Sequence, residues 1–302
     1  MTPLKGPDFF LVGAPKCGTT AMADYLDQHP EIAMCPYKEL HFFGTDLQSR
    51  APVKRDQWRP TRDEYMRTFE DLQRERRRGE ASGWYLYSSA APREIHDFCP
   101  GAGIVAMLRN PLTMLPSLHS QLVYWGIEPV EDFEQALALD EERERTGTPE
   151  GFVPDSYRSA VRYGGQLRRY LDVFGPEQVH VIIFDRFSDD TAGVFRETCE
   201  FLGVDPSFVP SIEVVNPNKM VRSRATRRLL RRPPEPLRRA LHAVTSRETR
   251  RRGGMILRRW NTRYVPRPPA SAAVNESLRA LVADEVRELK ELVGIDVSFW
   301  LD

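Results

Sequence analysis

The sequence predicts an α/β fold, a doubly wound parallel sheet with helices on both faces. Apolar runs of strand length alternate with helical patterns, and the first run, residues 9–13, leads straight into a glycine- and threonine-rich turn that opens a helix. Ligands of such sheets bind at the carboxyl ends of the strands, so the residues that follow each run are candidate site residues. With 302 residues, 41% of them hydrophobic, the chain can bury one core, and we expect a single domain over residues 1–302.

The first turn has the composition of a phosphate cradle. In FFLVGAPKCGTT (residues 9–20), backbone N–H groups of the turn and the start of the next helix point at one place, where the helix dipole adds partial positive charge. The spacing Gly13-x4-Gly18 fits the loop of triphosphate-binding proteins. However, Thr19 replaces the lysine expected after the second glycine, and the only lysine of the loop is Lys16. The turn therefore predicts a P-loop-like anion site whose cation lies on the other side of the phosphate.

The next segments are a short strand and a helix. The apolar piece at residues 32–35 ends at a polar turn with Lys38, Glu39 and His41. We expect this strand to end at the site. Residues 61–78 predict a surface helix, because apolar residues recur at three- and four-residue steps among charges. Its arginine-rich end, RERRRG, is expected to be a solvated face.

A second apolar run, residues 103–108, is too short for a helix and predicts a central strand that ends at Arg109. Pro111 suits the first position of the following helix, which Pro116 is expected to kink or interrupt. Ser117 follows eight residues after Arg109. A guanidinium fork with a hydroxyl suits a phosphate monoester, although an arginine at a strand end is by itself more commonly an ion-pair partner.

The alternation continues toward the C-terminus with a helix over residues 156–173 and a buried strand over 179–184. Residues 222–269 are rich in Arg and Pro, and we expect a lid or an insertion there. The closing stretch has apolar residues on one helical face and predicts a helix with Asn275 as its N-cap.

Composition limits the partners and the compartment. The 43 basic and 43 acidic residues balance, so no global field draws the chain to nucleic acid or an anionic membrane. No apolar run approaches the roughly 20 residues of a membrane helix, and we expect a cytoplasmic protein without a transmembrane segment. The four cysteines are scattered, without metal-ligand spacing, which favours free thiols and no metal site. Oligomeric state is left open.

Taken together and in order, these motifs resemble those of the sulfotransferases that use 3′-phosphoadenosine 5′-phosphosulfate (PAPS). PKCGTT is similar to their 5′-phosphosulfate loop, and LRNP with a serine eight residues on resembles their 3′-phosphate motif. KELHFFG resembles the segment that carries the catalytic glutamate in the carbohydrate-modifying branch. The later segments GEASGWYLYSSAAP, VNPNKMVRSR and ELVGIDVSFW are similar to the third block, the loop that closes on the nucleotide, and the C-terminal helix ending.

The resemblance implies which residues bind PAPS and its product 3′,5′-adenosine bisphosphate (PAP). Those around the 5′-phosphosulfate are Pro15, Lys16, Cys17, Gly18, Thr19 and Thr20. It also implies that Arg109 and Ser117 hold the 3′-phosphate. Arg222 and Arg224 are expected to close a lid over the same phosphate.

The resemblance implies three catalytic residues as well. Glu39 is expected to accept the proton of the acceptor hydroxyl as it attacks sulfur in line, and His41 is the next candidate for this role. Lys16 is expected to offset the charge that develops on the leaving group. One departure stands out: the heparan-type pattern E-K-[ST]-P has a lysine near the reaction centre, where this chain has Ala81. This difference points to another acceptor.

The leading hypothesis is therefore a PAPS-dependent O-sulfotransferase that needs no metal. Its acceptor is expected to be a hydroxyl of a small molecule, a glycan, a glycolipid or a secondary metabolite. The enzymatic alternative is a P-loop kinase or nucleotide hydrolase with ATP and Mg²⁺, although such enzymes need an Asp that closes a neighbouring strand. The non-enzymatic alternative is a protein that binds anions through the Arg-rich residues 222–263.

Overall fold

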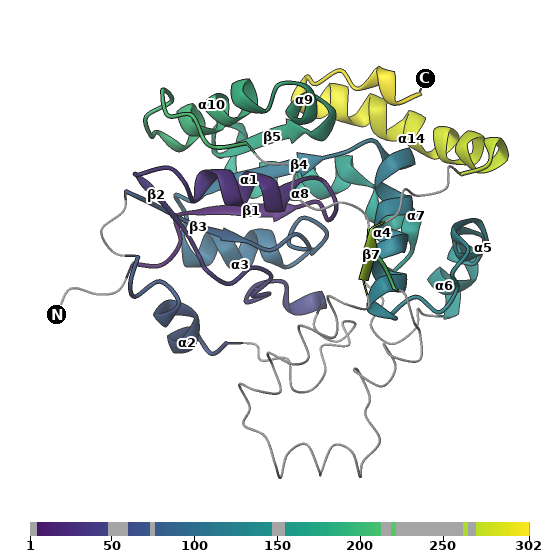
Figure 1. The fold of residues 1–302 in the computed structure, drawn as a ribbon, viewed down its shortest axis with the longest axis horizontal. Coiled ribbons are helices and arrows are strands. Elements are labelled where there is room, and N and C mark those ends of the chain that lie inside the picture. The colour runs from purple at the N-terminus through teal and green to yellow at the C-terminus, as the bar shows by residue number, and fades with distance from the viewer. Residues whose placement is uncertain are drawn as a thin grey trace, which may run out of the picture.

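The computed structural model describes residues 5–47, 60–72, 76–146, 155–212, 219–221, 262–264 and 270–301. It contains a five-stranded parallel sheet in the order β2-β3-β1-β4-β5, flanked by helices (Figure 1). The predicted α/β class with a parallel sheet is confirmed. Most of residues 222–269 lies outside the described residues, and the single domain stays a prediction. No helix of the described residues is long and apolar enough to cross a membrane.

Strand β1 lies at the centre of the sheet and every residue of it is buried. The strands are β1 (Phe9–Gly13), β2 (Ile32–Met34), β3 (Arg77–Ala81), β4 (Gly103–Leu108) and β5 (Val179–Ile183). Phe9 pairs with Gly79 in β3, where an added Cβ would lie 2.3 Å from the Phe9 ring, so this position admits only glycine. Because the strands are parallel, the turns after β1, β3 and β4 leave the sheet at one edge.

Helices cover both faces of the sheet, since the crossovers from β1 and β3 run in opposite directions and right-handed crossovers then lie on opposite sides. One group that packs together is α1 (Thr19–Leu26), α9 (Phe184–Asp189) and α10 (Thr191–Leu202). Another is α3 (Ala91–Phe98) and α8 (Tyr163–Phe174). The C-terminal helix α14 (Ala272–Val293) packs against α8 and α4 (Pro111–Trp125), as Figure 1 shows.

The remaining elements lie around this core. The short helices are α2 (Arg62–Arg67), α5 (Phe133–Ala138), α6 (Asp140–Thr146) and α7 (Tyr157–Ala160). The 3-10 turns are η1 (Thr45–Leu47), η2 (Pro176–Gln178) and η3 (Ser298–Leu301). An antiparallel pair joins β6 (Lys219–Val221) to β7 (Thr262–Tyr264), and β6 contacts α4.

The expectation of one helix over residues 61–78 is wrong. Helix α2 ends at Arg67, and Arg77 begins β3. Arg78 does not lie on a solvated face: it is only 7% exposed, and its Nη2 lies 2.5 Å from a carboxylate oxygen of Asp8. Its partner lies 70 residues away in sequence, so the local charge pattern suggested a surface.

Three helices also differ from the expectation. Helix α4 runs on through Pro116 without interruption. The predicted helix over residues 156–173 is two helices, α7 and α8. The closing helix begins before Asn275, because the hydroxyl of Ser271 accepts a hydrogen bond from the N–H of Val274 at 3.3 Å and is the N-cap.

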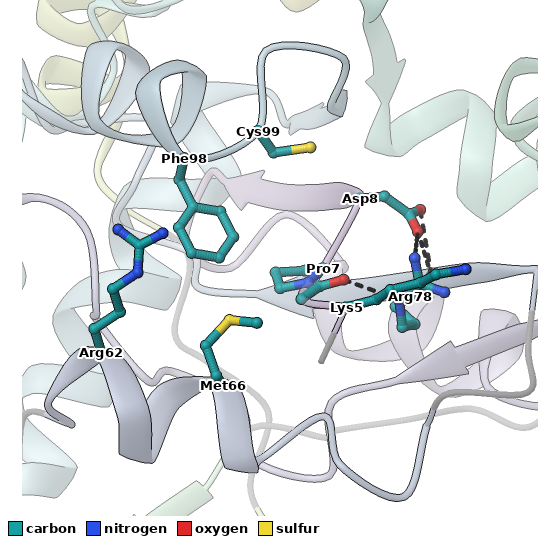
Figure 2. Close-up of a pocket in the computed structure, with 9 residues that line it drawn as sticks. Lys5, Pro7, Asp8, Arg62, Met66, Arg78, Phe98 and Cys99 are labelled. Atoms are coloured by element: carbon teal, nitrogen blue, oxygen red, sulfur yellow. Dashed lines mark hydrogen bonds and ion pairs between the residues drawn. The ribbon is translucent and has the colours of Figure 1, made fainter. Parts of the chain in front are cut away.

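A hollow of about 310 Å³ lies at the amino ends of the strands. Figure 2 shows Asp8, Arg78 and Phe98 among its lining residues. Asp8 directly precedes β1 and Arg78 is the second residue of β3, so this hollow lies at the opposite edge from the turns described above. It contains none of the predicted site residues.

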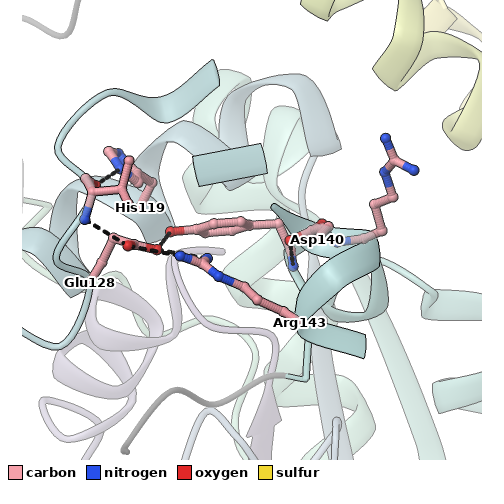
Figure 3. A network of polar contacts seen from close by, with 7 residues as sticks. His119, Glu128, Asp140 and Arg143 are labelled. Atoms are coloured by element: carbon pink, nitrogen blue, oxygen red, sulfur yellow. Dashed lines mark hydrogen bonds and ion pairs between the residues drawn. The ribbon is translucent and has the colours of Figure 1, made fainter. Parts of the chain in front are cut away.

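A buried polar network connects the end of α4 to helices α6 and α7 (Figure 3). The side chain of Glu128 is 0% exposed, and it accepts two hydrogen bonds from Arg143 at 2.8 and 3.0 Å. Tyr157 donates its hydroxyl to Glu128 at 2.9 Å. The carboxylate of Asp140 accepts the backbone N–H groups of Tyr157 and Arg158. These contacts fix the segment that follows α4.

We predict that Arg143→Met destabilises the fold by about 3–5 kcal/mol, because it leaves the buried Glu128 carboxylate without its cation. Urea unfolding monitored by circular dichroism measures the change. Arg287→Met is the matched control, since Arg287 pairs with Asp284 on the exposed surface of α14 and such pairs contribute little. Equal unfolding midpoints for the two variants would contradict this prediction.

Candidate active site

The turn after β1 has the backbone shape of an anion cradle. The N–H of Ala14 donates to the carbonyl of Met107 in β4 at 2.7 Å, which fixes the turn to the neighbouring strand. Lys16 has φ 66° and Gly18 has φ 89°, both in the left-handed region. A Cβ on Gly18 would also lie 3.0 Å from the Phe184 ring. Space and backbone conformation therefore both favour glycine at the N-cap of α1.

Arg109 lies directly after β4, and three contacts orient its guanidinium. Nη1 donates to the carbonyl of Lys16 at 3.2 Å, and Nε donates to the hydroxyl of Thr113 at 2.9 Å. The guanidinium carbon lies 4.5 Å from the centre of the Phe184 ring, within range of a cation–π contact. The structure thus brings Arg109 beside the turn of Lys16. Ser117 lies further along α4 and is only 2% exposed.

Tyr163 connects the backbone of this arginine to the turn after β1. Its hydroxyl donates to the carbonyl of Arg109 at 3.1 Å and lies 4.0 Å from the Sγ of Cys17. The Trp300 ring packs against Tyr163 with centroids 6.2 Å apart. Sequence analysis missed Tyr163 and Phe184, because they come from distant elements and no local spacing marks them.

Cys17 is a packing residue of the turn. It is fully buried, and its thiol donates to the carbonyl of Pro15 at 3.4 Å. Burial raises the pKa of Cys17 to about 12, so the thiolate is scarce at neutral pH. These observations argue against a role as nucleophile.

Glu39 lies in the turn after β2 and next to the end of β3. Its side chain is 44% exposed, and its carboxylate accepts the N–H of Gly83 at 3.1 and 3.2 Å. Nε2 of His41 lies 3.3 Å from the same carboxylate. A Cβ on Gly83 would lie 3.4 Å from Glu39 Oε1 and 3.7 Å from the Cα of Pro15, so the carboxylate is close to the turn after β1.

The side chain of Lys38 contacts the backbone at the start of α1. Its ammonium donates to the carbonyl of Thr19 at 3.3 Å and joins the turn after β2 to the start of α1. Burial lowers the pKa of Lys38, while Glu39 raises it by a smaller amount. Burial likewise lowers the pKa of His41, so its imidazole is neutral at neutral pH.

A buried carboxylate, Glu80, lies beneath this turn. It is 0% exposed and accepts hydrogen bonds from the hydroxyls of Tyr65, Ser82 and Tyr85. Burial raises the pKa of Glu80 to about 7, against the lowering effect of these hydrogen bonds. Sequence analysis treated the block around Glu80 only as a family motif, and nothing in its spacing indicated this network. Ala81, which replaces the lysine of the heparan-type pattern, is buried at the end of β3.

Arg222 and Arg224 lie outside the described residues, and their contact with a phosphate stays a prediction. The strand β6 ends directly before Arg222 and contacts α4, the helix that carries Ser117. Within the described part of the chain, no group of three His, Cys, Asp or Glu side chains is arranged to hold a metal ion.

We predict that Cys17 stays unmodified when the native protein is treated with iodoacetamide at neutral pH, because its thiol is buried and protonated. Cys99, which is partly exposed, serves as the internal control and reacts first. Peptide mass spectrometry measures both. Labelling of Cys17 as fast as Cys99 would show that the turn opens readily or that the thiol is activated.

Two comparisons place the chain among known proteins. A model of the sulfotransferase family matches residues 7–208. The chain is 26% identical over 202 residues to heparan sulfate glucosamine 3-O-sulfotransferase 6 of Homo sapiens, covering 66% of this chain and 52% of that protein. It is 29% identical over 260 residues to carbohydrate sulfotransferase 15 of Homo sapiens, covering 66% of this chain and 44% of that protein. The chain thus spans about half or less of the length of these curated relatives.

A solved structure is similar over the whole chain. The sulfotransferase from Alicyclobacillus acidocaldarius superposes with a TM-score of 0.72 and 31% sequence identity, over 99% of this chain and 100% of that one. The family model covers well over half of the residues, and its match includes the turn after β1, Glu39 and Arg109. The chain therefore belongs to the sulfotransferase family.

Proposed function

We propose that this protein transfers a sulfuryl group from PAPS to the hydroxyl of an acceptor. The observation that carries the proposal is the contact between Arg109 and the carbonyl of Lys16, which holds two candidate anion-binding groups together. The carboxylate of Glu39 lies close to the same turn. Membership of the sulfotransferase family favours sulfuryl transfer over phosphoryl transfer at such a site.

The residues at this edge of the sheet fit a donor with two phosphate ends. The glycine-containing turn and the N-terminus of α1 suit the 5′-phosphosulfate, and we propose that Pro15, Lys16, Cys17, Gly18, Thr19 and Thr20 surround it. The fork of Arg109, already oriented by Thr113 and Phe184, suits the dianionic 3′-phosphate, and we propose the hydroxyl of Ser117 on α4 as its second partner. The bound donor supplies the activated sulfuryl group. We also propose that Arg222 and Arg224 close a lid over the 3′-phosphate.

The catalytic roles follow from charge and exposure. The ammonium of Lys16 offsets the negative charge that develops on the bridging oxygen as the bond to sulfur breaks. The exposed carboxylate of Glu39, oriented by the N–H of Gly83, accepts the proton of the acceptor hydroxyl. The neutral imidazole of His41 lies beside this carboxylate and helps to orient it. The turn that carries them is held to α1 through Lys38.

The acceptor class is wider than the one named for the curated relatives. Those relatives are named for heparan sulfate and carbohydrate. Here a buried Ala81 occupies the place of the lysine in the heparan-type pattern, which favours a different hydroxyl, in a small molecule, a glycan, a glycolipid or a secondary metabolite. Tyr37 is 60% exposed two residues before Glu39, and an exposed aromatic ring there suits contact with a ring-shaped acceptor.

We predict that PAP raises the melting temperature of the protein and that Arg109→Ala and Lys16→Ala each reduce this rise. A ligand at 100 times its dissociation constant adds about 2.7 kcal/mol, a shift of several degrees. Arg168→Ala is the matched control, because Arg168 pairs with Glu288 away from the site. ATP with Mg²⁺ is run in parallel. Stabilisation by ATP with Mg²⁺ alone would contradict the proposal and favour a kinase or nucleotide hydrolase.

We predict that Glu39→Gln lowers kcat for transfer from PAPS by roughly 10² to 10⁴ and leaves the affinity for PAP unchanged, because it removes the base and not the anion site. Glu141→Gln, an exposed carboxylate on α6, is the matched control. Release of PAP from PAPS, measured by chromatography with a panel of hydroxyl acceptors, gives the rates. Equal rates for the two variants would mean that another group takes the proton.

A further inference from the structure

We propose that Glu80 is a positioning residue that holds the turn of Glu39 and His41 in its working geometry. Glu80 acts through the hydroxyls of Ser82 and Tyr85 and has no contact with either substrate. The inference rests on the proposed function, because it assumes that Glu39 is the base.

The first part of this connection is a buried carboxylate with three hydroxyl donors. Oε1 of Glu80 accepts hydrogen bonds from Ser82 at 2.8 Å and from Tyr85 at 2.9 Å. Oε2 accepts one from Tyr65 at 2.5 Å. All four residues are buried, so each bond is formed in a medium where it is strong and where an unpaired group is costly.

The second part joins two of these hydroxyls to the backbone of the turn. The Ser82 oxygen accepts the N–H of His41 at 3.4 Å, and the Tyr85 oxygen accepts the N–H of Phe43 at 3.2 Å. A hydroxyl has one proton, and in both cases that proton points to Glu80. The oxygen therefore faces the turn as an acceptor. By accepting the hydroxyl protons of Ser82 and Tyr85, Glu80 makes both oxygens acceptors for the N–H groups of the turn.

The turn needs such support because its backbone is strained. Glu39 has φ 58° and His41 has φ 48°, both in the left-handed region that non-glycine residues seldom occupy. The N–H of Glu39 donates to the carbonyl of Ala81 at 3.0 Å, and its carboxylate accepts the N–H of Gly83. The end of β3 and the residues after it therefore hold both ends of the turn.

Tyr65 and Tyr85 provide a matched pair for a test. Both hydroxyls donate to Glu80, and both rings pack against the turn, Tyr65 on Phe42 at 4.0 Å and Tyr85 on Phe43 at 5.8 Å between centroids. The Tyr85 hydroxyl also accepts the backbone N–H of Phe43. Tyr85→Phe breaks the connection to the turn, whereas Tyr65→Phe removes a bond to Glu80 and leaves the turn attached.

The experiment compares Tyr85→Phe, Ser82→Ala and Glu80→Gln with Tyr65→Phe. The first readout is the Cε1–H resonance of His41 in histidine-labelled protein, assigned by its loss in His41→Gln. The second is PAP release from PAPS with water as the acceptor, for which we expect the same base to take the proton. We expect the first three variants to shift the His41 resonance and to lower kcat by about 10- to 100-fold at unchanged KM for PAPS. Tyr65→Phe should stay near the wild type in both readouts.

Each outcome has a distinct meaning. If Tyr85→Phe and Ser82→Ala match Tyr65→Phe in the His41 resonance and in kcat, the positioning role of Glu80 is wrong. If the wild type neither binds PAP nor releases it from PAPS, the proposed function is wrong, and the His41 resonance still reports on the turn. Should Glu80→Gln fail to fold, the two hydroxyl variants carry the test, since Tyr85→Phe keeps the buried ring.

Discussion

The central position of β1 is the constraint on which the site depends. β1 is buried along its whole length and pairs in parallel with β3 on one side and β4 on the other. Parallel pairing forces the residues that follow these three strands to emerge together at the carboxyl edge. The turn with Lys16, the segment with Gly83 and the start of α4 at Arg109 are neighbours for this reason. The same geometry places the hollow lined by Asp8 and Arg78 at the opposite, amino edge of the sheet, away from these residues.

Backbone atoms make many of the contacts that assemble this edge. The carbonyl of Lys16 accepts from Arg109, the carbonyl of Thr19 accepts from Lys38, and the N–H of Gly83 donates to Glu39. Each bond joins two segments that follow different strands of the sheet. Charged side chains are thus oriented by main-chain groups whose positions the sheet fixes, and this preorganisation serves both anion binding and proton transfer.

The sequence predicts the structure correctly where the signal is local. The apolar runs of β1 and β4, the glycine at φ 89° and the arginine after β4 all follow from patterns within a few residues. The prediction is wrong where the stabilising partner of a residue is distant in sequence. The helix predicted over residues 61–78 wrongly included Arg77 and Arg78, the first two residues of β3, and the carboxylate of Asp8 that pairs with the supposedly solvated Arg78 comes from before β1. The Glu80 network and Tyr163 were invisible for the same reason.

The most direct test of the account is a crystal structure of the protein with PAP. We expect the 5′-phosphate within hydrogen-bonding distance of the backbone N–H groups of residues 16–20 and the 3′-phosphate on the guanidinium of Arg109. The carboxylate of Glu39 should then face the open side of the 5′-phosphate. Density for PAP in the hollow of Asp8 and Arg78, with the carboxyl edge empty, would contradict the account.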